Sequence, residues 1–275
     1  MSAARQASVR DLAKRRRPMR APAPVCVTGM HRSGTSLVAG MVGDLGIDMG
    51  RPAEMITAEM FDLPADDQPG GYHENVRFLR LDDAILNRMG GDNYRVPELS
   101  SGWATAPVLA DERRRAEALA VELRARAPWG FKDPRAMLLL ELWLDVVPDL
   151  QVVLCLRNPM EVAQSVAARG HIGVDDALRW WSRCHDLCVP ALPPTTVVVA
   201  HDRVLEDPRR ELRRIAEVIG LDVDGPLLDR AASRVDGRLY RQRVAIEPHR
   251  LPTDVRDRYE QLRRRATATS PLASR

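Results

Sequence analysis

The strongest chemical signal in the chain is the run Gly-Met-His-Arg-Ser-Gly-Thr-Ser at residues 29–36. It follows a short apolar segment and precedes a helix-like one, so it is predicted to form a turn between a strand and a helix. Such a turn directs backbone N–H groups and the positive end of the helix at one point, where phosphate-like anions bind. Its side chains would add further donors to the anion. These donors belong to Arg32, Ser33, Thr35 and Ser36.

The two glycines of this turn, Gly29 and Gly34, have the spacing of a nucleotide-binding P-loop. The lysine that follows the second glycine in a P-loop is replaced by Thr35. That lysine reaches the outer phosphates of ATP, so its loss weakens one alternative, a P-loop kinase or NTPase. Such an enzyme would also need an acidic Mg²⁺ ligand at the end of a strand, for which Asp202 is the candidate.

A second anion-binding element is predicted around Arg157 and Ser165. Arg157 ends a buried apolar strand, and open α/β sheets bind ligands at the carboxyl ends of their strands. Ser165 lies eight residues further on, which on a helix is an advance of about 12 Å. The two side chains can therefore bind one anion only if the chain folds back between them, and Asn158-Pro159 allows this.

The loop Val-Thr-Gly-Met-His-Arg-Ser-Gly-Thr-Ser-Leu resembles the 5′-phosphosulfate loop of the P-loop sulfotransferases, whose donor is 3′-phosphoadenosine-5′-phosphosulfate (PAPS). It is most similar to bacterial sulfotransferase-domain proteins and to the tyrosylprotein-type branch. These have Arg-Ser-Gly-Thr where the cytosolic sulfotransferases have Lys-Ser-Gly-Thr. Arg157 and Ser165 resemble the 3′-phosphate motif of the same family. The similarity spans residues 24–222 and is weakest over 49–110.

This resemblance implies transfer of a sulfuryl group from PAPS to a hydroxyl by in-line displacement, without a metal ion. Arg32 would then take part in catalysis as well as in donor binding. The acceptor is left open among small-molecule, carbohydrate, lipid-linked and peptide-tyrosine hydroxyls, because residues 49–73 and 90–110, which should line its pocket, carry no specificity code. A third alternative is a sulfotransferase-like module that binds an adenine nucleotide without catalysis.

Glu74 is the first candidate for the base that takes the proton of the acceptor. The segment Gly70-Gly-Tyr-His-Glu74 resembles the Gly-aromatic-x-Glu segment of the family, and the tyrosylprotein-type branch uses a glutamate base. His73 is the alternative, because an imidazole titrates near neutral pH. Neighbouring residues at the start of a helix point about 100° apart, so only one of the two is expected to face the site.

Lys132 is the second catalytic candidate. Of the 41 lysines and arginines only Lys14 and Lys132 are lysines, so position 132 carries the one ammonium group of the predicted folded body. A compact ammonium differs from a guanidinium in shape and hydration, which suggests a specific role for it. In the family a lysine near this place contacts the reacting centre. Asp133 and Arg135 are expected to brace this segment by an ion pair.

Short apolar runs alternate with amphipathic segments along the chain, which is typical of an α/β fold with a parallel sheet. The resemblance implies a P-loop-type, three-layer fold with about five central strands flanked by helices. Strands are expected at residues 24–29, 129–131, 151–157 and 195–200. Helices are expected at 35–45, 74–89, 111–127, 136–147, 159–169, 175–187 and 208–219.

The 275 residues are 45% hydrophobic and 29% charged, as in globular proteins. The net charge of +3 comes from the first 24 residues, and the rest of the chain is mildly acidic. We expect a disordered basic leader at 1–23, a sulfotransferase-like domain at 24–245, and a polar, partly helical or frayed segment at 246–275. An arginine-rich stretch, 238–243, is a candidate to reach over the 3′-phosphate.

The acidic body and an aromatic content of only 4% argue against a nucleic-acid partner. No apolar run is long enough to predict a transmembrane helix. The four cysteines suit a reducing compartment, so a cytoplasmic location is expected. A chain rich in alanine and arginine but poor in lysine is typical of a GC-rich bacterial genome.

Overall fold

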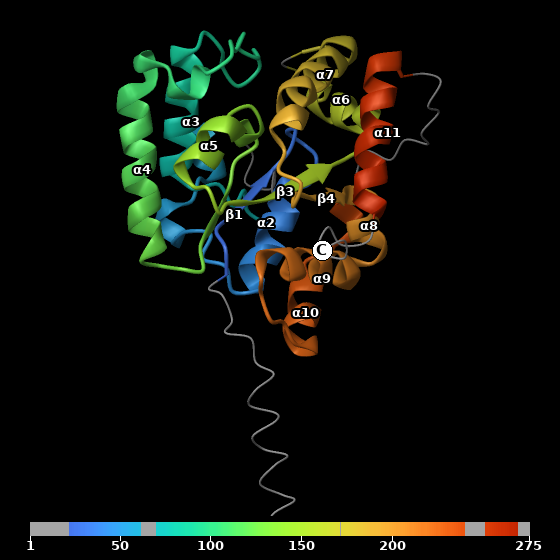
Figure 1. Ribbon diagram of the computed structural model, residues 1–275. Helices are drawn as coiled ribbons and strands as arrows, with labels where there is room; N and C mark the ends of the chain where they lie inside the picture. Colours follow the sequence, from blue (N-terminus) through green and yellow to red (C-terminus); the bar gives the residue numbers. More distant parts are fainter. Residues whose placement is uncertain (1–21, 62–69, 171, 240–250, 269–275) are drawn as a thin grey trace, which may run out of the picture.

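The computed structural model describes residues 22–61, 70–170, 172–239 and 251–268. Four strands form one parallel sheet at the centre of the molecule, in the order β2-β1-β3-β4 (Figure 1). The expected α/β fold with a parallel sheet is confirmed. Its strands are β1 (Val25–Thr28), β2 (Gly130–Lys132), β3 (Gln151–Leu156) and β4 (Val197–Ala200).

The described sheet has four strands rather than the expected five or so. At its β2 edge the chain passes once more beside the sheet, at Asp48. There the Asp48 amide donates to the Pro128 carbonyl at 2.8 Å, and the Gly130 amide donates to the Asp48 carbonyl at 3.0 Å. This contact is an isolated bridge between Asp48 and Trp129, and it is too short to form a strand.

Helices cover both faces of the sheet, which explains why its strands are apolar without polar alternation. Val25 and Val27 pack on one face and Cys26 on the other, and all three are fully buried. The first face is covered by α2 (Thr35–Asp44), α9 (Pro208–Ile219) and α10 (Gly225–Ala232). The second face has the larger cluster, with α3 (Val76–Arg88), α4 (Ala110–Arg124), α5 (Leu140–Val146), α6 (Pro159–Ala167), α7 (Val174–Ala191) and α11 (Thr253–Thr267).

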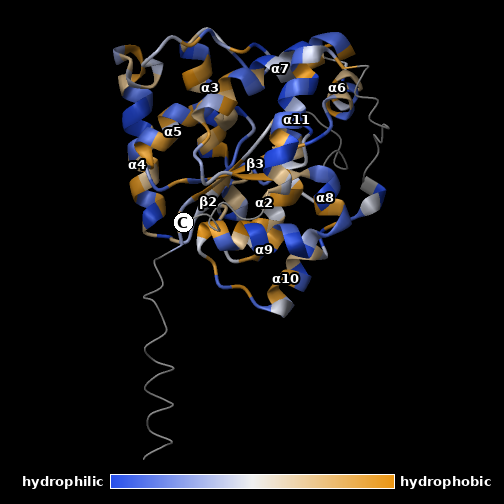
Figure 2. Ribbon diagram, turned by 45° about the vertical axis from the view of Figure 1, so that its right-hand side comes forward, coloured by the Kyte–Doolittle hydropathy of each residue, from blue (hydrophilic) through white to orange (hydrophobic). Residues whose placement is uncertain are grey.

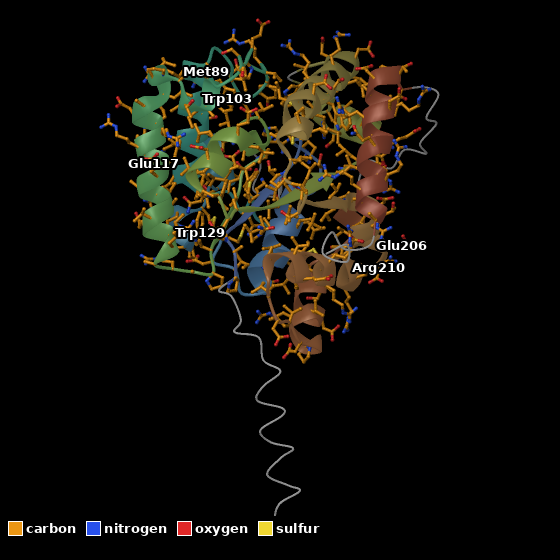
Figure 3. The ribbon with its side chains drawn as sticks, viewed as in Figure 1. Met89, Trp103, Glu117, Trp129, Glu206 and Arg210 are labelled. Carbon is orange, nitrogen blue, oxygen red and sulfur yellow. The ribbon has the colours of Figure 1, made fainter. Side chains whose placement is uncertain are left out.

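The layers are visible in Figure 1, where α2, α9 and α10 lie below the sheet and α3, α5, α6 and α7 lie above it, with α4 at the left and α11 at the right. Figure 2 shows apolar strands at the centre and helices whose polar residues face outward. On α4, for example, the half-exposed Glu117 points away from the sheet (Figure 3). Within the described residues, no helix is both long and apolar enough to cross a membrane.

Most helix boundaries have local causes in the sequence. The Asn158 side chain caps α6 by accepting from the Met160 amide at 3.0 Å, and Pro159 occupies the first helical position. Helix α9 ends at Gly220, which has the left-handed conformation that favours glycine. The helix expected at 136–147 is divided. A 3₁₀ turn, η5 (Arg135–Met137), precedes α5 because the Asp133 carboxylate accepts from the Arg135 amide at 2.8 Å and tightens the turn.

Candidate functional site

All four strands run parallel, so their carboxyl ends meet at one edge of the sheet. The residues that follow these ends come from four distant parts of the sequence: the loop 29–34 after β1, Lys132 at the end of β2, Arg157 after β3 and His201 after β4. Ligands of open α/β sheets bind at this edge. Sheet topology alone therefore brings the predicted anion-binding elements together.

The loop between β1 and α2 has a backbone that few residue types accept. Gly34 has a φ of 87° and caps α2, and Arg32 has a φ of 68°, which is uncommon for a residue with a side chain. A Cβ atom at Gly29 would lie 2.4 Å from the carbonyl oxygen of Cys155 on β3. Three hydroxyl side chains of the loop and the first turn of α2 are buried. They are those of Ser33, Thr35 and Ser36.

The two predicted anion-binding elements are joined through Arg32. Its Nε donates to the Oγ of Ser165 on α6 at 3.0 Å. Arg157 in turn donates from Nη1 to the backbone carbonyl of Arg32 at 3.1 Å, and from Nε to Glu161 at 2.8 Å. Arg157 and Ser165, which lie on either side of Asn158-Pro159 in the sequence, therefore both contact Arg32. Two guanidinium groups and a hydroxyl thus converge beside the loop.

A second cluster lies at the end of β2. The Lys132 ammonium pairs with the Glu74 carboxylate and lies 3.4 Å from the Ser36 hydroxyl. All three residues are buried. Burial by itself raises the pKa of Glu74, but the charges of Lys132 and Arg135 outweigh burial and hold this pKa below its ordinary value. Glu74 is therefore a carboxylate at neutral pH.

Arg135 holds the other oxygen of this carboxylate. Its Nη1 lies 3.3 Å from Glu74 and 2.9 Å from Asp133, and its Nε lies 2.6 Å from Asp83. The expected brace between Asp133 and Arg135 is therefore present. The contact of Arg135 with Glu74 was not expected, and no local pattern could have indicated it, because 61 residues separate the two.

His73, the alternative base, points elsewhere. Its Nε2 lies 2.8 Å from the carbonyl oxygen of Gly70. The same nitrogen is 2.9 Å from the position that a Cβ atom would take at Gly40 of α2. Burial lowers the pKa of His73, so the imidazole is neutral at physiological pH. Of the two adjacent candidates, only Glu74 contacts Lys132.

Two histidines that the sequence analysis did not select also lie at this edge. His201 packs against Gly34, where a Cβ atom would be 2.5 Å from its Cδ2, and burial lowers its pKa to about 4. His31, next to Arg32 in the loop, is half-buried, and burial together with the nearby Arg135 lowers its pKa to about 3. The sequence did contain a signal for His31, because this residue lies inside the predicted anion-binding loop.

The arginine-rich stretch 238–243 is described only at its start. Arg238 is exposed and pairs with Asp236 at 2.8 Å. Residues 240–243 of this stretch lie outside the described residues. The same is true of the basic leader through residue 21 and of residues 62–69 in the expected acceptor loop. Among the described residues, no group of three or more histidine, cysteine, aspartate or glutamate side chains has a metal-binding arrangement.

Known proteins resemble this chain in sequence and in fold. The model of the sulfotransferase family matches residues 24–225. The sulfotransferase domain of the olefin synthase from Synechococcus PCC 7002 superposes with a TM-score of 0.50 at 18% identity, covering 90% of this chain and 98% of that domain. The sulfotransferase domain from the curacin biosynthetic pathway gives 0.53 at 13% identity, with coverages of 89% and 98%.

At these identities the two solved domains establish a common fold and no more. None of the curated proteins matches this chain. The family model covers well over half of the chain, including the loop, Lys132, Arg157 and Ser165. The chain therefore belongs to the sulfotransferase family.

Proposed function

We propose that this protein transfers a sulfuryl group from PAPS to a hydroxyl of a small-molecule, carbohydrate or lipid-linked acceptor. In this reaction the acceptor oxygen bonds to sulfur while the bond between sulfur and the 5′-phosphate oxygen breaks. The acceptor proton passes to Glu74, and adenosine 3′,5′-bisphosphate leaves. Membership of the sulfotransferase family supports this reaction class.

The observation that carries the proposal is the position of the Lys132 ammonium, which contacts both Ser36 and Glu74. Ser36 belongs to the segment that would hold the phosphosulfate, and Glu74 is the proposed base. In-line transfer requires the donor and the acceptor oxygen on one axis, with the developing charge neutralised. The Lys132 ammonium lies between the two groups, where it can neutralise the charge that develops during transfer.

The donor would be held at both of its anionic ends. The 5′-phosphosulfate binds the loop through Arg32, Ser33, Gly34, Thr35 and Ser36 and the start of α2. Arg157 and Ser165 bind the 3′-phosphate, the group that distinguishes PAPS from most adenine nucleotides. Arg32 already touches Ser165, so the two ends of the donor site are physically continuous.

The two alternatives lack comparable support. Asp202, the carboxylate that a kinase would need for Mg²⁺, is exposed and pairs with Arg263 on α11 at 2.6 Å. A module that only binds nucleotide has no need of the Lys132–Glu74 pair, and desolvating two buried charges costs free energy that a binding site could avoid.

A thermal-shift comparison followed by a transfer assay tests the proposal. Adenosine 3′,5′-bisphosphate without Mg²⁺ is expected to raise the melting temperature more than AMP or ATP, and donor labelled in the sulfuryl group is expected to yield a labelled acceptor. Greater stabilisation by ATP with Mg²⁺ would favour the kinase alternative. Bisphosphate binding without transfer to any hydroxyl would favour the non-catalytic module.

A further inference from the structure

The backbone immediately before the proposed base has an unusual conformation. Among the described residues other than glycine, only Arg32 and His73 have a positive φ, and that of His73 is 55°. Side chains make this left-handed conformation costly, so it persists only where the surrounding structure imposes it. Arg32 belongs to the loop that would hold the donor, and His73 directly precedes Glu74. The direction in which Glu74 leaves the chain therefore depends on what holds His73.

The imidazole of His73 is held by its own turn and by helix α2. Its Nε2 donates to the carbonyl of Gly70 at 2.8 Å. The same nitrogen lies 2.9 Å from the position that a Cβ atom would take at Gly40, a buried residue in the middle of α2. A side chain at residue 40 would thus occupy space that the ring now uses. The glycine at this position allows the ring to lie directly against the helix.

Arg234 lies at the same gap on α2. Its Nη1 is 3.0 Å and its Cδ 3.3 Å from the Cβ position of Gly40. The guanidinium is fixed to α2 by Asp44, to which Nη2 donates at 3.0 Å and with which Nε also pairs. Helix α10, which ends two residues before Arg234, packs against α2 (Figure 1). The space beside Gly40 is therefore filled by two side chains from distant parts of the sequence.

The chain is also fixed directly after Glu74. The Ile56 amide donates to the Glu74 carbonyl at 2.9 Å. The Asn75 side chain caps α3 by accepting from the Arg77 amide at 2.9 Å. The backbone of Glu74 is thus held from two sides, by these bonds after it and by His73 before it.

Helix α2 connects the His73 contact with the donor site. Ser36, in the first turn of α2, lies 3.4 Å from the Lys132 ammonium. Gly40 is four residues further on, and residues at this spacing lie on the same face of a helix, one turn apart. One face of α2 therefore contacts Lys132 near the proposed phosphosulfate site and the His73 ring beside the proposed base.

We propose that His73 is a positioning residue for the proposed base: its ring, lying against Gly40 of α2, holds the left-handed backbone that directs the Glu74 carboxylate to Lys132. This inference rests on the proposed function, in which Glu74 takes the acceptor proton. It gives His73 a role that requires no proton transfer by the imidazole. A misplacement of about 1 Å can cost about 100-fold in rate, so the direction of Glu74 matters for turnover.

Replacement of Gly40 tests this role without changing His73. Gly40→Ala places a methyl group against Nε2 of His73 and Nη1 of Arg234, and both atoms belong to side chains that can move aside while the helix stays folded. Gly43→Ala on the same helix is the matched control, because its new Cβ meets only Met49, at an ordinary 3.5 Å. Both replacements favour the helix equally, so a difference between them comes from the displaced side chains.

The coupling between Lys132 and Glu74 gives a readout that needs no acceptor. Urea denaturation of Lys132→Met, Glu74→Gln and the double variant measures this coupling as a fold-change in the unfolding equilibrium constant. We expect about 10-fold or more in the wild-type and Gly43→Ala backgrounds, and less than about 3-fold in the Gly40→Ala background. Undiminished coupling in the Gly40→Ala background overturns the inference.

Turnover is measured with PAPS labelled in the sulfuryl group and three acceptor probes: 2-naphthol, methyl β-D-glucopyranoside and octyl β-D-glucopyranoside. Gly40→Ala is expected to lower kcat about 10- to 100-fold with an unchanged Kd for adenosine 3′,5′-bisphosphate, and Gly43→Ala to match the wild-type protein. Equal kcat in the two variants contradicts the inference. A wild-type protein that sulfates none of the probes contradicts the proposed function instead, and the coupling measurement then still decides whether His73 positions Glu74.

Substitutions of His73 itself distinguish positioning from proton transfer. Asparagine accepts a left-handed backbone and has no group that titrates near neutral pH, so His73→Asn should lower kcat by less than about 3-fold. The β-branched side chain of His73→Val opposes a positive φ, so this variant should lose as much turnover as Gly40→Ala. Equal kcat in the two His73 variants, or a loss in His73→Asn as large as that in Glu74→Gln, overturns the positioning role.

Discussion

The Nε of Arg32 donates to the Oγ of Ser165 at 3.0 Å across 133 residues of sequence. This contact joins the loop after β1 to the helix after β3. Because Arg157 also donates to the Arg32 carbonyl, the two proposed halves of the donor site are held by one network.

Arg157→Ala is expected to weaken binding of adenosine 3′,5′-bisphosphate. Removing a charged hydrogen-bond donor costs about 1.5–3 kcal/mol, or roughly 10- to 150-fold in Kd. Isothermal titration measures this change. Arg210→Ala is the control, because Arg210 is exposed on the outer surface of α9 (Figure 3). Equal losses in both variants would mean that Arg157 has no specific role in binding.

Glu74→Gln is expected to retain bisphosphate binding and to lower kcat by about 10²- to 10⁴-fold, because the amide cannot accept the acceptor proton. Single-turnover transfer of labelled sulfate measures the loss. Glu117→Gln on the outer face of α4 is the control for a change of charge. Full turnover in Glu74→Gln combined with a loss in His73→Gln would assign the base to His73.

Lys132→Met is expected to destabilise the fold, because it leaves Glu74 buried with Arg135 as its remaining cationic partner. Breaking a buried ion pair costs about 3–5 kcal/mol, and the low end applies here because Arg135 stays. The double variant Lys132→Met/Glu74→Gln should recover most of the free energy of unfolding without recovering turnover. Urea denaturation measures stability, and unchanged stability in Lys132→Met would show that the pair is not buried.

Arg135→Gln is expected to move the acidic limb of the kcat/KM profile to higher pH. Glu74 must be ionised to accept a proton, and its pKa lies below the ordinary 4.5 partly because of Arg135. Loss of this cation raises that pKa, so activity at pH 5 falls more than activity at pH 8. Asp83→Asn leaves the Arg135–Glu74 contact intact, so it should move the acidic limb of the kcat/KM profile by less than Arg135→Gln does. A uniform loss at every pH would show that Arg135 has only a structural role.

Gly34→Ala is expected to weaken bisphosphate binding and to lower stability. A φ of 87° costs a side-chain-bearing residue about 1–2 kcal/mol, and the added methyl group also meets His201 at 2.5 Å. Gly46→Ala separates the backbone strain from the contact with His201. Gly46 also has a positive φ, of 101°, but no atom lies within 4 Å of the new Cβ. Gly34→Ala should cost more than Gly46→Ala, and His201→Ala should remove the difference. Equal costs would show that the loop tolerates the contact.

Local sequence determined the elements and several of their ends. The run from Val25 to Thr28 is apolar and β-branched, so it forms a strand buried on both faces, and Gly34 provides the left-handed residue that starts α2. Helix α9 occupies the predicted residues because Pro208 and Gly220 delimit it. These features depend on contacts within a few residues, and a single sequence contains that information.

Only the tertiary structure decided which side chains meet. Lys132 lies 58 residues from Glu74, and whether Glu74 or His73 faces it depends on how the start of α3 packs against β2 and α2. The same holds for Arg135 with Glu74. Parallel strands join through long crossovers, so residues at neighbouring strand ends are remote in the sequence and their contacts are set by the packing of the whole sheet.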